Sequence, residues 1–157
     1  MRFAAQGWRA LALASVLGGA AAAASCSQSV TAPSSAPYSQ VDLLVGTGDI
    51  AASSDILTVN YTGWLYDPSK PDNKGLVFDT SIGKDPFVFT LGTASVIQGW
   101  DQGIVGMKVG GIRRLVIPPS LAYGSFRNNS IPPYSTLVFE VELLGLCTTT
   151  STSTCSG

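Results

Sequence analysis

The stretch PFVFTLGTASVIQGWDQGIVGMKVGGIRRLVIPPSLAYG (86–124) decides the fold, because its hydrophobic pattern changes from strand to helix and back to strand. Residues 87–91 carry their largest apolar side chains at every second position, which predicts a half-buried strand. Residues 112–117 predict another strand. That strand should stop at Pro118-Pro119, because proline has no N–H to donate to a sheet.

A short helix is predicted between these two strands. The apolar residues in 96–104 recur at helical intervals, which favours a helix with one apolar face. Ser95 and Gln98 have the spacing of a capping box, in which the two side chains satisfy backbone N–H groups at the start of a helix. We therefore expect the helix to start at Ser95.

Further strands are predicted on both sides of the opening stretch. Residues 56–62 and 137–144 alternate over their whole length, and 41–45 and 76–79 are shorter candidates. One amphipathic helix among several antiparallel strands predicts an α+β domain, in which the helix covers the concave face of a twisted antiparallel sheet. The expected domain covers residues 41–146.

The composition excludes several classes of function. The chain has 157 residues, 9 Lys and Arg against 10 Asp and Glu, and a net charge of −1, so it lacks the basic surface that nucleic-acid binding needs. It has no histidine. Ser-His-Asp and Cys-His catalysis and histidine-ligated metals are therefore excluded, and we expect neither a metal nor a cofactor.

Residues 1–25 have the features of an export signal. Two arginines frame the start of an apolar run at 11–24, which is too short for a stable membrane span. Small residues then precede Cys26, as in a bacterial lipobox, whose cysteine becomes lipidated. We expect an exported protein of the cell envelope that contacts the membrane only through this lipid. Secretion with cleavage near Ala24 and an uncleaved membrane anchor remain alternatives.

Flexible segments are expected at both ends of the domain. Residues 26–40 are rich in Ser, Ala and Pro, which favours a flexible tether, and residues 147–157 form a Thr/Ser-rich tail. The tail contains Cys147 and Cys155. A disulfide can close a loop of this size in an oxidising compartment, but the spacing leaves open whether one forms.

The aromatic residues have two interpretations from their pattern alone. They could simply fill the core, or they could line an incompletely filled pocket beneath the helix. Asp79 also has two interpretations, because it could cap a turn or orient a tyrosine of such a pocket. Glu140 and Glu142 lie on the outward side of their predicted strand, where we expect them to be solvated.

Four segments, taken in order, carry a family resemblance. They are VNYTGWLYD (59–67), VFDTS (77–81), the opening stretch (86–124) and IPPYSTLVFEVELLGL (131–146). With this order and spacing the chain resembles the FKBP-type peptidyl-prolyl cis-trans isomerases. That family folds as a twisted antiparallel sheet wrapped around one short helix, which agrees with the fold expected from the pattern.

The resemblance implies a proline-binding pocket. The residues that it assigns to catalysis are Tyr61, Asp79, Tyr123 and Phe139. The residues that it assigns to substrate binding are Phe78, Phe87, Val96, Ile97, Trp100 and Ile131. By the same resemblance Trp100 forms the pocket floor, and the Ile97 backbone N–H and the Tyr123 hydroxyl donate to carbonyl groups of the ligand. Asp79 lies at the aromatic edge as a polar acceptor.

The implied activity is rotation about X-Pro bonds in proline-containing polypeptides, which here would assist the folding of exported proteins. Tacrolimus and rapamycin are implied macrolide ligands. A proline-binding or holdase module with little turnover is the alternative, and the loss of Asp79, Phe139 or Tyr123 would favour it, but all three are present. A structural envelope domain would instead expose a large apolar patch outside the pocket.

Two loops differ from the family pattern. Residues 67–75 are longer than in minimal members and are expected to form an exposed excursion that tunes partners. Residues 125–130 form a loop that is shorter than the family's common form and unlike it in sequence, which places Phe126 and Arg127 where the pocket rim is expected. No long helix of the kind that dimerises some bacterial members precedes Val41, so we expect a monomer.

Overall fold

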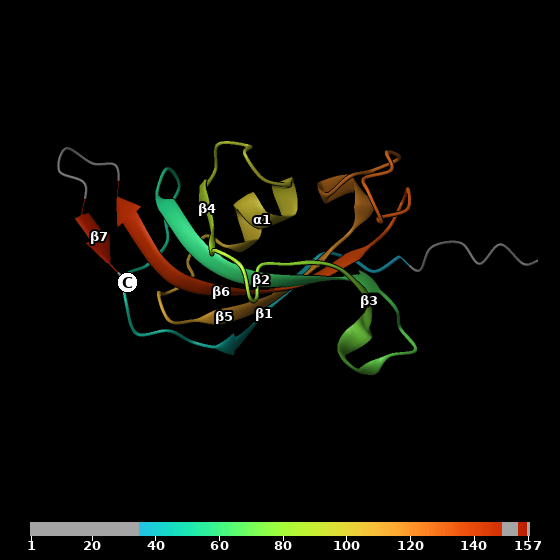
Figure 1. Cartoon of the computed structure of the whole chain (residues 1–157), viewed down its shortest axis with the longest axis horizontal. Helices are drawn as coiled ribbons and strands as arrows, with labels where there is room; N and C mark the ends of the chain where they lie inside the picture. The colour runs from blue at the N-terminus through green and yellow to red at the C-terminus, as the bar shows by residue number, and fades with distance from the viewer. Residues whose placement is uncertain (1–34, 149–153, 157) are drawn as a thin grey trace, which may run out of the picture. The chain divides into compact units, whose positions relative to one another are not determined.

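The alternating segments form the strands of one antiparallel sheet in the computed structural model, which describes residues 35–148 and 154–156. Within these residues there are seven strands: β1 (Ser39–Leu44), β2 (Ile56–Tyr66), β3 (Lys74–Thr80), β4 (Phe87–Thr90), β5 (Ile112–Ile117), β6 (Leu137–Thr148) and β7 (Thr154–Ser156). The order across the sheet is β1-β5-β6-β2-β3, with β4 paired to β2 and β7 paired to β6. As Figure 1 shows, the sheet curves around helix α1 (Gln98–Gly103), the one α-helix within the described residues. The fold class expected from the sequence is therefore confirmed.

Strand β6 forms the centre of the core. Its alternate residues Leu137, Phe139, Val141 and Leu143 are buried, as their period predicts. β6 pairs with β5 on one side and β2 on the other, so both its edges are hydrogen-bonded. It is longer than the sequence pattern predicts and reaches Thr148.

Helix α1 packs closely against β5, and two glycines of the helix allow this approach. A Cβ added to Gly99 would lie 2.5 Å from a side-chain carbon of Ile117, and one added to Gly103 would lie 2.8 Å from Leu115. Glycine weakens a helix by roughly 1 kcal/mol relative to alanine. Here the close approach accounts for both glycines, because a larger residue would push the helix off the sheet.

The predicted start of the helix is wrong. The helix begins at Gln98, and its N-cap residue Ile97 makes no side-chain capping bond. Ser95 instead donates its hydroxyl to the carbonyl oxygen of Thr90, 3.0 Å away. The capping box does not form because Ser95 lies in the loop before the helix, where its hydroxyl is directed back toward the end of β4.

Arg113 fastens the end of α1 to the edge of the sheet. Its guanidinium is buried and donates to both carboxylate oxygens of Asp42 on β1, at 2.6 and 3.1 Å. The same side chain donates to the carbonyl oxygens of Gly103 and Val105, at 2.8 and 3.1 Å. These four bonds satisfy a buried charge and the carbonyls at the end of the helix.

The outward face of the sheet carries a charged cluster, so the expectation for Glu140 needs correction. Glu140 is paired with Lys74 at 2.6 Å and with Arg114 at 2.9 Å, and its side chain is 24% exposed. Arg114 also pairs with Asp72 at 3.0 Å. Asp72 belongs to η1 (Pro71–Asn73). The excursion at 67–75 is therefore exposed but tied back to the sheet, because Arg114 can reach two carboxylates at once.

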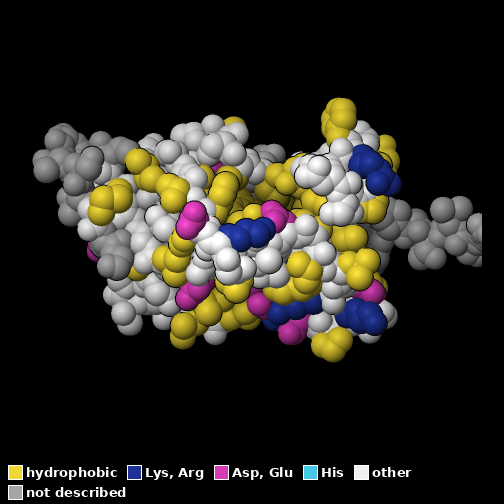
Figure 2. Space-filling model, in the orientation of Figure 1, with side chains coloured by type: hydrophobic (Ala, Val, Ile, Leu, Met, Phe, Trp, Pro, Cys, Tyr) yellow, Lys and Arg dark blue, Asp and Glu magenta, His cyan; other side chains and the backbone are white. Residues whose placement is uncertain are grey.

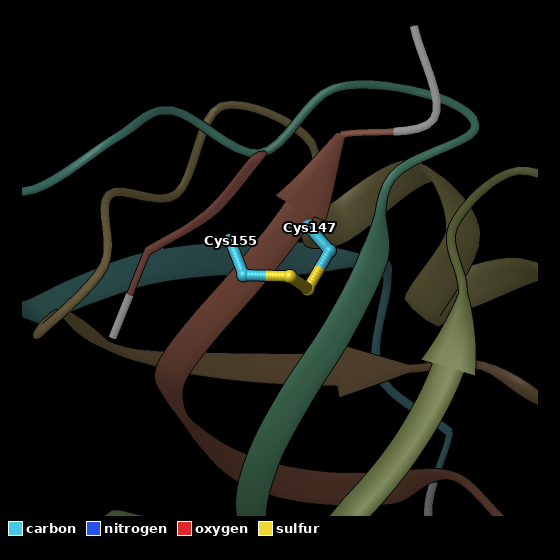
Figure 3. Close-up of a disulfide and its surroundings, with 2 residues drawn as sticks. All are labelled: Cys147 and Cys155. Carbon is cyan, nitrogen blue, oxygen red and sulfur yellow. A yellow bond between two sulfur atoms is a disulfide. The ribbon is translucent and has the colours of Figure 1, made fainter. Parts of the chain in front are cut away.

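The C-terminal cysteines form a disulfide, which closes the question that their spacing left open (Figure 3). Cys147 lies in β6 and Cys155 in β7, and the two face each other across the antiparallel pair. Thus part of the segment expected as a tail is a strand. No helix in the described part of the chain is long and apolar enough to cross a membrane. The expected signal and Cys26 lie outside the described residues.

Candidate functional site

An aromatic cavity of about 180 Å³ opens between the concave side of the sheet and α1. Figure 2 shows hydrophobic side chains interspersed with polar and charged ones on the face of the molecule in view. The residues that line the cavity are Tyr61, Phe78, Asp79, Phe87, Ser95, Val96, Ile97, Trp100, Tyr123 and Phe139. Nine of the ten pocket residues predicted by the resemblance thus lie together, although they come from distant parts of the sequence.

Trp100 lies at the bottom of this cavity. It is only 4% exposed, and edge-to-face contacts fix its indole against Tyr61 and Phe139, with ring centroids 5.2 Å away in both cases. Its Nε1 is buried without a hydrogen-bond partner in the described residues. Because aromatic edges pack against ring faces here, the floor is rigid and apolar.

Gly63 is part of the site, although sequence reasoning missed it. A Cβ at this position would lie 2.6 Å from the ring of Phe78 and 2.8 Å from the ring of Phe139. Those two rings pack edge to face at 5.5 Å. The glycine within VNYTGWLYD therefore lets two cavity walls meet, and its place between aromatic residues was the signal that could have identified it.

The polar edge of the cavity is a hydrogen-bonded pair. The Tyr61 hydroxyl donates to Oδ2 of Asp79 at 2.5 Å, and the Thr80 N–H donates to Oδ1 at 2.8 Å. Burial, and then the neighbouring Asp79 carboxylate, raise the pKa of Tyr61 far above its ordinary value of 10. Tyr61 therefore remains a protonated donor, and Asp79 accepts hydrogen bonds both from this tyrosine and from the N–H of Thr80, the last residue of β3.

Tyr123 forms the opposite rim. It follows η2 (Pro119–Leu121), and its loop is held by hydrogen bonds from the Gly124 N–H to Pro119 O and from the Tyr134 N–H to Gly124 O, at 2.9 and 2.7 Å. Burial raises the pKa of Tyr123, so its hydroxyl also remains protonated at neutral pH.

Ile131 and Phe126 lie in loops and are not among the residues that line the cavity. Ile131 does not line the cavity, since its side chain is 5% exposed and packs within the hydrophobic core. The 128–131 loop closes on itself through backbone hydrogen bonds between Asn128 and Ile131. The assignment of Ile131 to substrate binding remains a prediction. Phe126 is 78% exposed, beside the cavity residue Tyr123, whose carbonyl accepts the Phe126 N–H.

Ile97 brings a free donor to the cavity. Ile97 lines the cavity, and its carbonyl accepts hydrogen bonds from the N–H groups of Trp100 and Asp101. Its own N–H has no acceptor among the described residues. The site thus combines a small aromatic cavity with backbone and tyrosine donors at its margin, which defines a binding site for a compact apolar ring attached to a chain with carbonyl groups.

Comparison of the chain with known proteins identifies the family to which it belongs. The model of the FKBP-type peptidyl-prolyl cis-trans isomerase family matches residues 48–144. The chain belongs to this family.

Several relatives span the same domain. The chain is 55% identical over 94 residues to "FK506-binding protein 2B" of Rhizopus delemar, and 44% identical over 103 residues to "FK506-binding protein 1" of Aspergillus oryzae. These matches use 59% and 63% of this chain, and 42% and 89% of the relatives. The "FK506-binding protein" of Neisseria meningitidis serogroup B is 46% identical over 105 residues, which is 66% of this chain and 90% of the relative.

Two solved structures share the fold. FkpA from Escherichia coli has a TM-score of 0.60 and 42% sequence identity, over 69% of this chain and 47% of FkpA. AtFKBP13 has a TM-score of 0.59 and 36% identity, over 68% of this chain and 90% of that protein. The chain therefore spans less than half of the Rhizopus relative and of FkpA.

Proposed function

We propose that this chain catalyses rotation about X-Pro bonds and assists the folding of exported proteins. The aromatic cavity carries this proposal. It combines a rigid apolar floor at Trp100 with Ile97, whose backbone N–H has no acceptor among the described residues. The prolyl ring of a client would enter above Trp100. The Ile97 N–H and the Tyr123 hydroxyl would donate to carbonyl groups of the client chain.

The chemistry suits a site without histidine, because no bond has to be cleaved. Amide resonance sets a rotation barrier of about 18–20 kcal/mol, and uncatalysed X-Pro isomerisation takes tens of seconds or longer. The twisted amide has lost charge separation, so a desolvated aromatic cavity favours it over the planar ground state. An acceleration of about 10⁵ would need roughly 7 kcal/mol of differential stabilisation.

Each polar group has a separate part in this mechanism. A hydrogen bond from Ile97 or Tyr123 fixes the client carbonyl while the bond rotates. Asp79 is not a proton carrier, because no proton is transferred in the rotation. Its carboxylate holds the Tyr61 hydroxyl at 2.5 Å and adds negative potential at one side of the cavity. Desolvation, hydrogen bonding and a bent client conformation together supply the stabilisation.

We also propose export and anchoring through lipid on Cys26, with the active domain as a monomer. The apolar run and the small residues before Cys26 support this location. The disulfide between Cys147 and Cys155 adds support, since disulfides persist mainly in oxidising compartments. Tacrolimus (FK506) and rapamycin are proposed ligands of the same cavity, and the names of the relatives contain FK506.

The holdase alternative receives less support than catalysis. A proline-binding module could use the same apolar floor and donors. Catalysis is favoured because the model of the peptidyl-prolyl cis-trans isomerase family matches residues 48–144.

Refolding of an exported client whose slow step is prolyl isomerisation tests this proposal. We expect the chain to accelerate that step at sub-stoichiometric amounts, and tacrolimus to stop the acceleration. A holdase would reduce aggregation without changing the rate. For the anchor, we expect Cys26→Ser to move the protein from the membrane fraction to the soluble fraction, whereas membrane retention of this variant would contradict lipidation.

A further inference from the structure

The loop between β4 and α1 forms one wall of the cavity without regular secondary structure. It contributes three consecutive lining residues, Ser95, Val96 and Ile97. The hydroxyls of Thr93 and Ser95 donate to the carbonyl of Thr90, at 2.9 and 3.0 Å, which anchors the first half of the loop to β4. These bonds do not reach Ile97.

Asp101, on the first turn of α1, contacts both ends of this loop. Its Oδ1 accepts the Gly92 N–H at 2.8 Å, and its Oδ2 accepts the Ala94 N–H at 2.9 Å. Its own backbone N–H donates to the carbonyl oxygen of Ile97 at 3.3 Å. One residue therefore ties the beginning of the loop to its end.

The backbone of the loop needs such a tie. Gly92 and Ala94 have φ values of +77° and +56°, in the left-handed region that a residue with a Cβ occupies at a cost. Hydrogen bonds to an ionised carboxylate are about twice as strong as neutral ones, so the carboxylate offsets that cost. Ala94 is held in this conformation by a bond from its own N–H.

We propose that Asp101 is a positioning residue, which directs the Ile97 N–H at the carbonyl of the bound client through the loop that it closes. This inference rests on the proposed function, since it assigns a task to the same cavity. Ile97 lines the cavity, and its N–H has no acceptor within the described residues. Hydrogen bonds weaken steeply when the donor angle falls, so a loop that changes direction would lose this contact while the floor stays intact.

The test is the nearly isosteric substitution Asp101→Asn. The amide keeps one acceptor but turns an NH₂ group toward one of the two N–H donors, which breaks one bond and removes the charge. Losing a well-directed hydrogen bond to the ligand should lower kcat/KM by about 5- to 10-fold and weaken tacrolimus binding by a similar factor. We expect KM to change more than kcat, because the contact also forms with the ground state. Asp101→Glu keeps the charge and should lose less.

Asp67→Asn is the matched control. Asp67 also accepts a loop N–H, that of Ser69 at 2.9 Å, together with the Ser69 hydroxyl at 2.6 Å, but it lies in the 67–75 excursion and does not line the cavity. We expect unchanged kcat/KM and tacrolimus binding in this variant. Equal losses in both variants, or an unchanged kcat/KM and tacrolimus affinity in folded Asp101→Asn, would overturn the proposal.

A measurement without turnover separates this inference from the function. The NMR signal of the Ile97 amide should shift on adding tacrolimus to the wild-type chain and to Asp67→Asn, and shift clearly less in Asp101→Asn. Amide hydrogen exchange should become faster at Gly92 and Ala94 in Asp101→Asn only. A wild-type chain that accelerates no X-Pro peptide contradicts the proposed function. Unchanged exchange at Gly92 and Ala94 contradicts the role of Asp101.

Discussion

Removal of the Cys147–Cys155 disulfide should lower the free energy of unfolding and leave the aromatic cavity unaffected. The two cysteines are eight residues apart, and the bond joins β6 to β7 where they pair. A cross-link restricts the unfolded chain, and for a loop of about eight residues the loss is roughly 8 cal/mol/K, or about 2.5 kcal/mol at 25 °C. We therefore expect Cys147→Ser/Cys155→Ser to lower the free energy of unfolding by about 2.5 kcal/mol.

Urea unfolding of the oxidised chain and of the double variant measures this difference, since the midpoint falls when stability falls at constant slope. Reduced wild-type chain should match the double variant. The rate of X-Pro isomerisation should not change, because the nearest β6 residue that lines the cavity is Phe139, well before Cys147. Equal stability of the oxidised chain and the double variant, or loss of activity in a folded variant, would refute this reasoning.

Three further predictions concern the cavity edge and the helix anchor. Tyr61→Phe removes the donor to Asp79 and should lower kcat/KM about tenfold. The loss of stability should be small, because the Asp79 side chain is 49% exposed and can be hydrated. Tyr66→Phe on the same strand is the control, and equal activity of the two variants would contradict the role of Tyr61. Burial and the Asp79 carboxylate raise the pKa of Tyr61 far above its ordinary value of 10, and burial raises the pKa of Tyr123. We therefore expect kcat/KM, measured up to pH 10, not to show the half-loss that deprotonation of an ordinary tyrosine would give, and a half-loss near pH 10 would be incompatible with this account. Arg113 holds the pKa of Asp42 below its usual range, so the stability that this pair contributes is present above about pH 4 and is lost as the pH falls through the lower pKa of the folded state. Asp42→Asn should lower the free energy of unfolding in urea by about 2 kcal/mol and flatten this acid dependence. An unchanged acid dependence of stability would argue against the pair.

The strands could be predicted because local pattern and burial agree. The bounds of β5 were predicted correctly from alternation and from the two prolines that follow it. The register of β6 could also be predicted, because Phe139 and Val141 are buried on one side. Hydrophobic period is a local property of the sequence, so no knowledge of the fold was needed for these elements.

The parts that could not be predicted depend on contacts between distant residues. Ser95 and Gln98 have the right spacing for a cap, but the Asp101 carboxylate holds the loop before the helix in another conformation. Strand β7 forms only where Cys155 meets Cys147, and spacing alone cannot decide that pairing. Gly63 matters because two rings approach it in three dimensions.

The cavity residues were found through family resemblance rather than through their pattern. Alternation places Tyr61 and Phe139 on the inner side of the sheet, but it cannot distinguish a filled core from a cavity. The difference depends on how closely α1 packs, which Gly99 and Gly103 determine through contacts with β5. Ile131 is buried in the hydrophobic core and is not among the cavity-lining residues, so its assignment to substrate binding rests on the resemblance alone.

The central claim is that the aromatic cavity turns over X-Pro bonds. The most direct measurement is the cis-to-trans relaxation rate of short X-Pro peptides with different residues before proline, with and without the chain. We predict acceleration far above the uncatalysed rate, inhibited by tacrolimus, weakened in Tyr123→Phe and Asp79→Val and weakened most in Phe139→Ala. A folded chain that accelerates none of these peptides would contradict the claim.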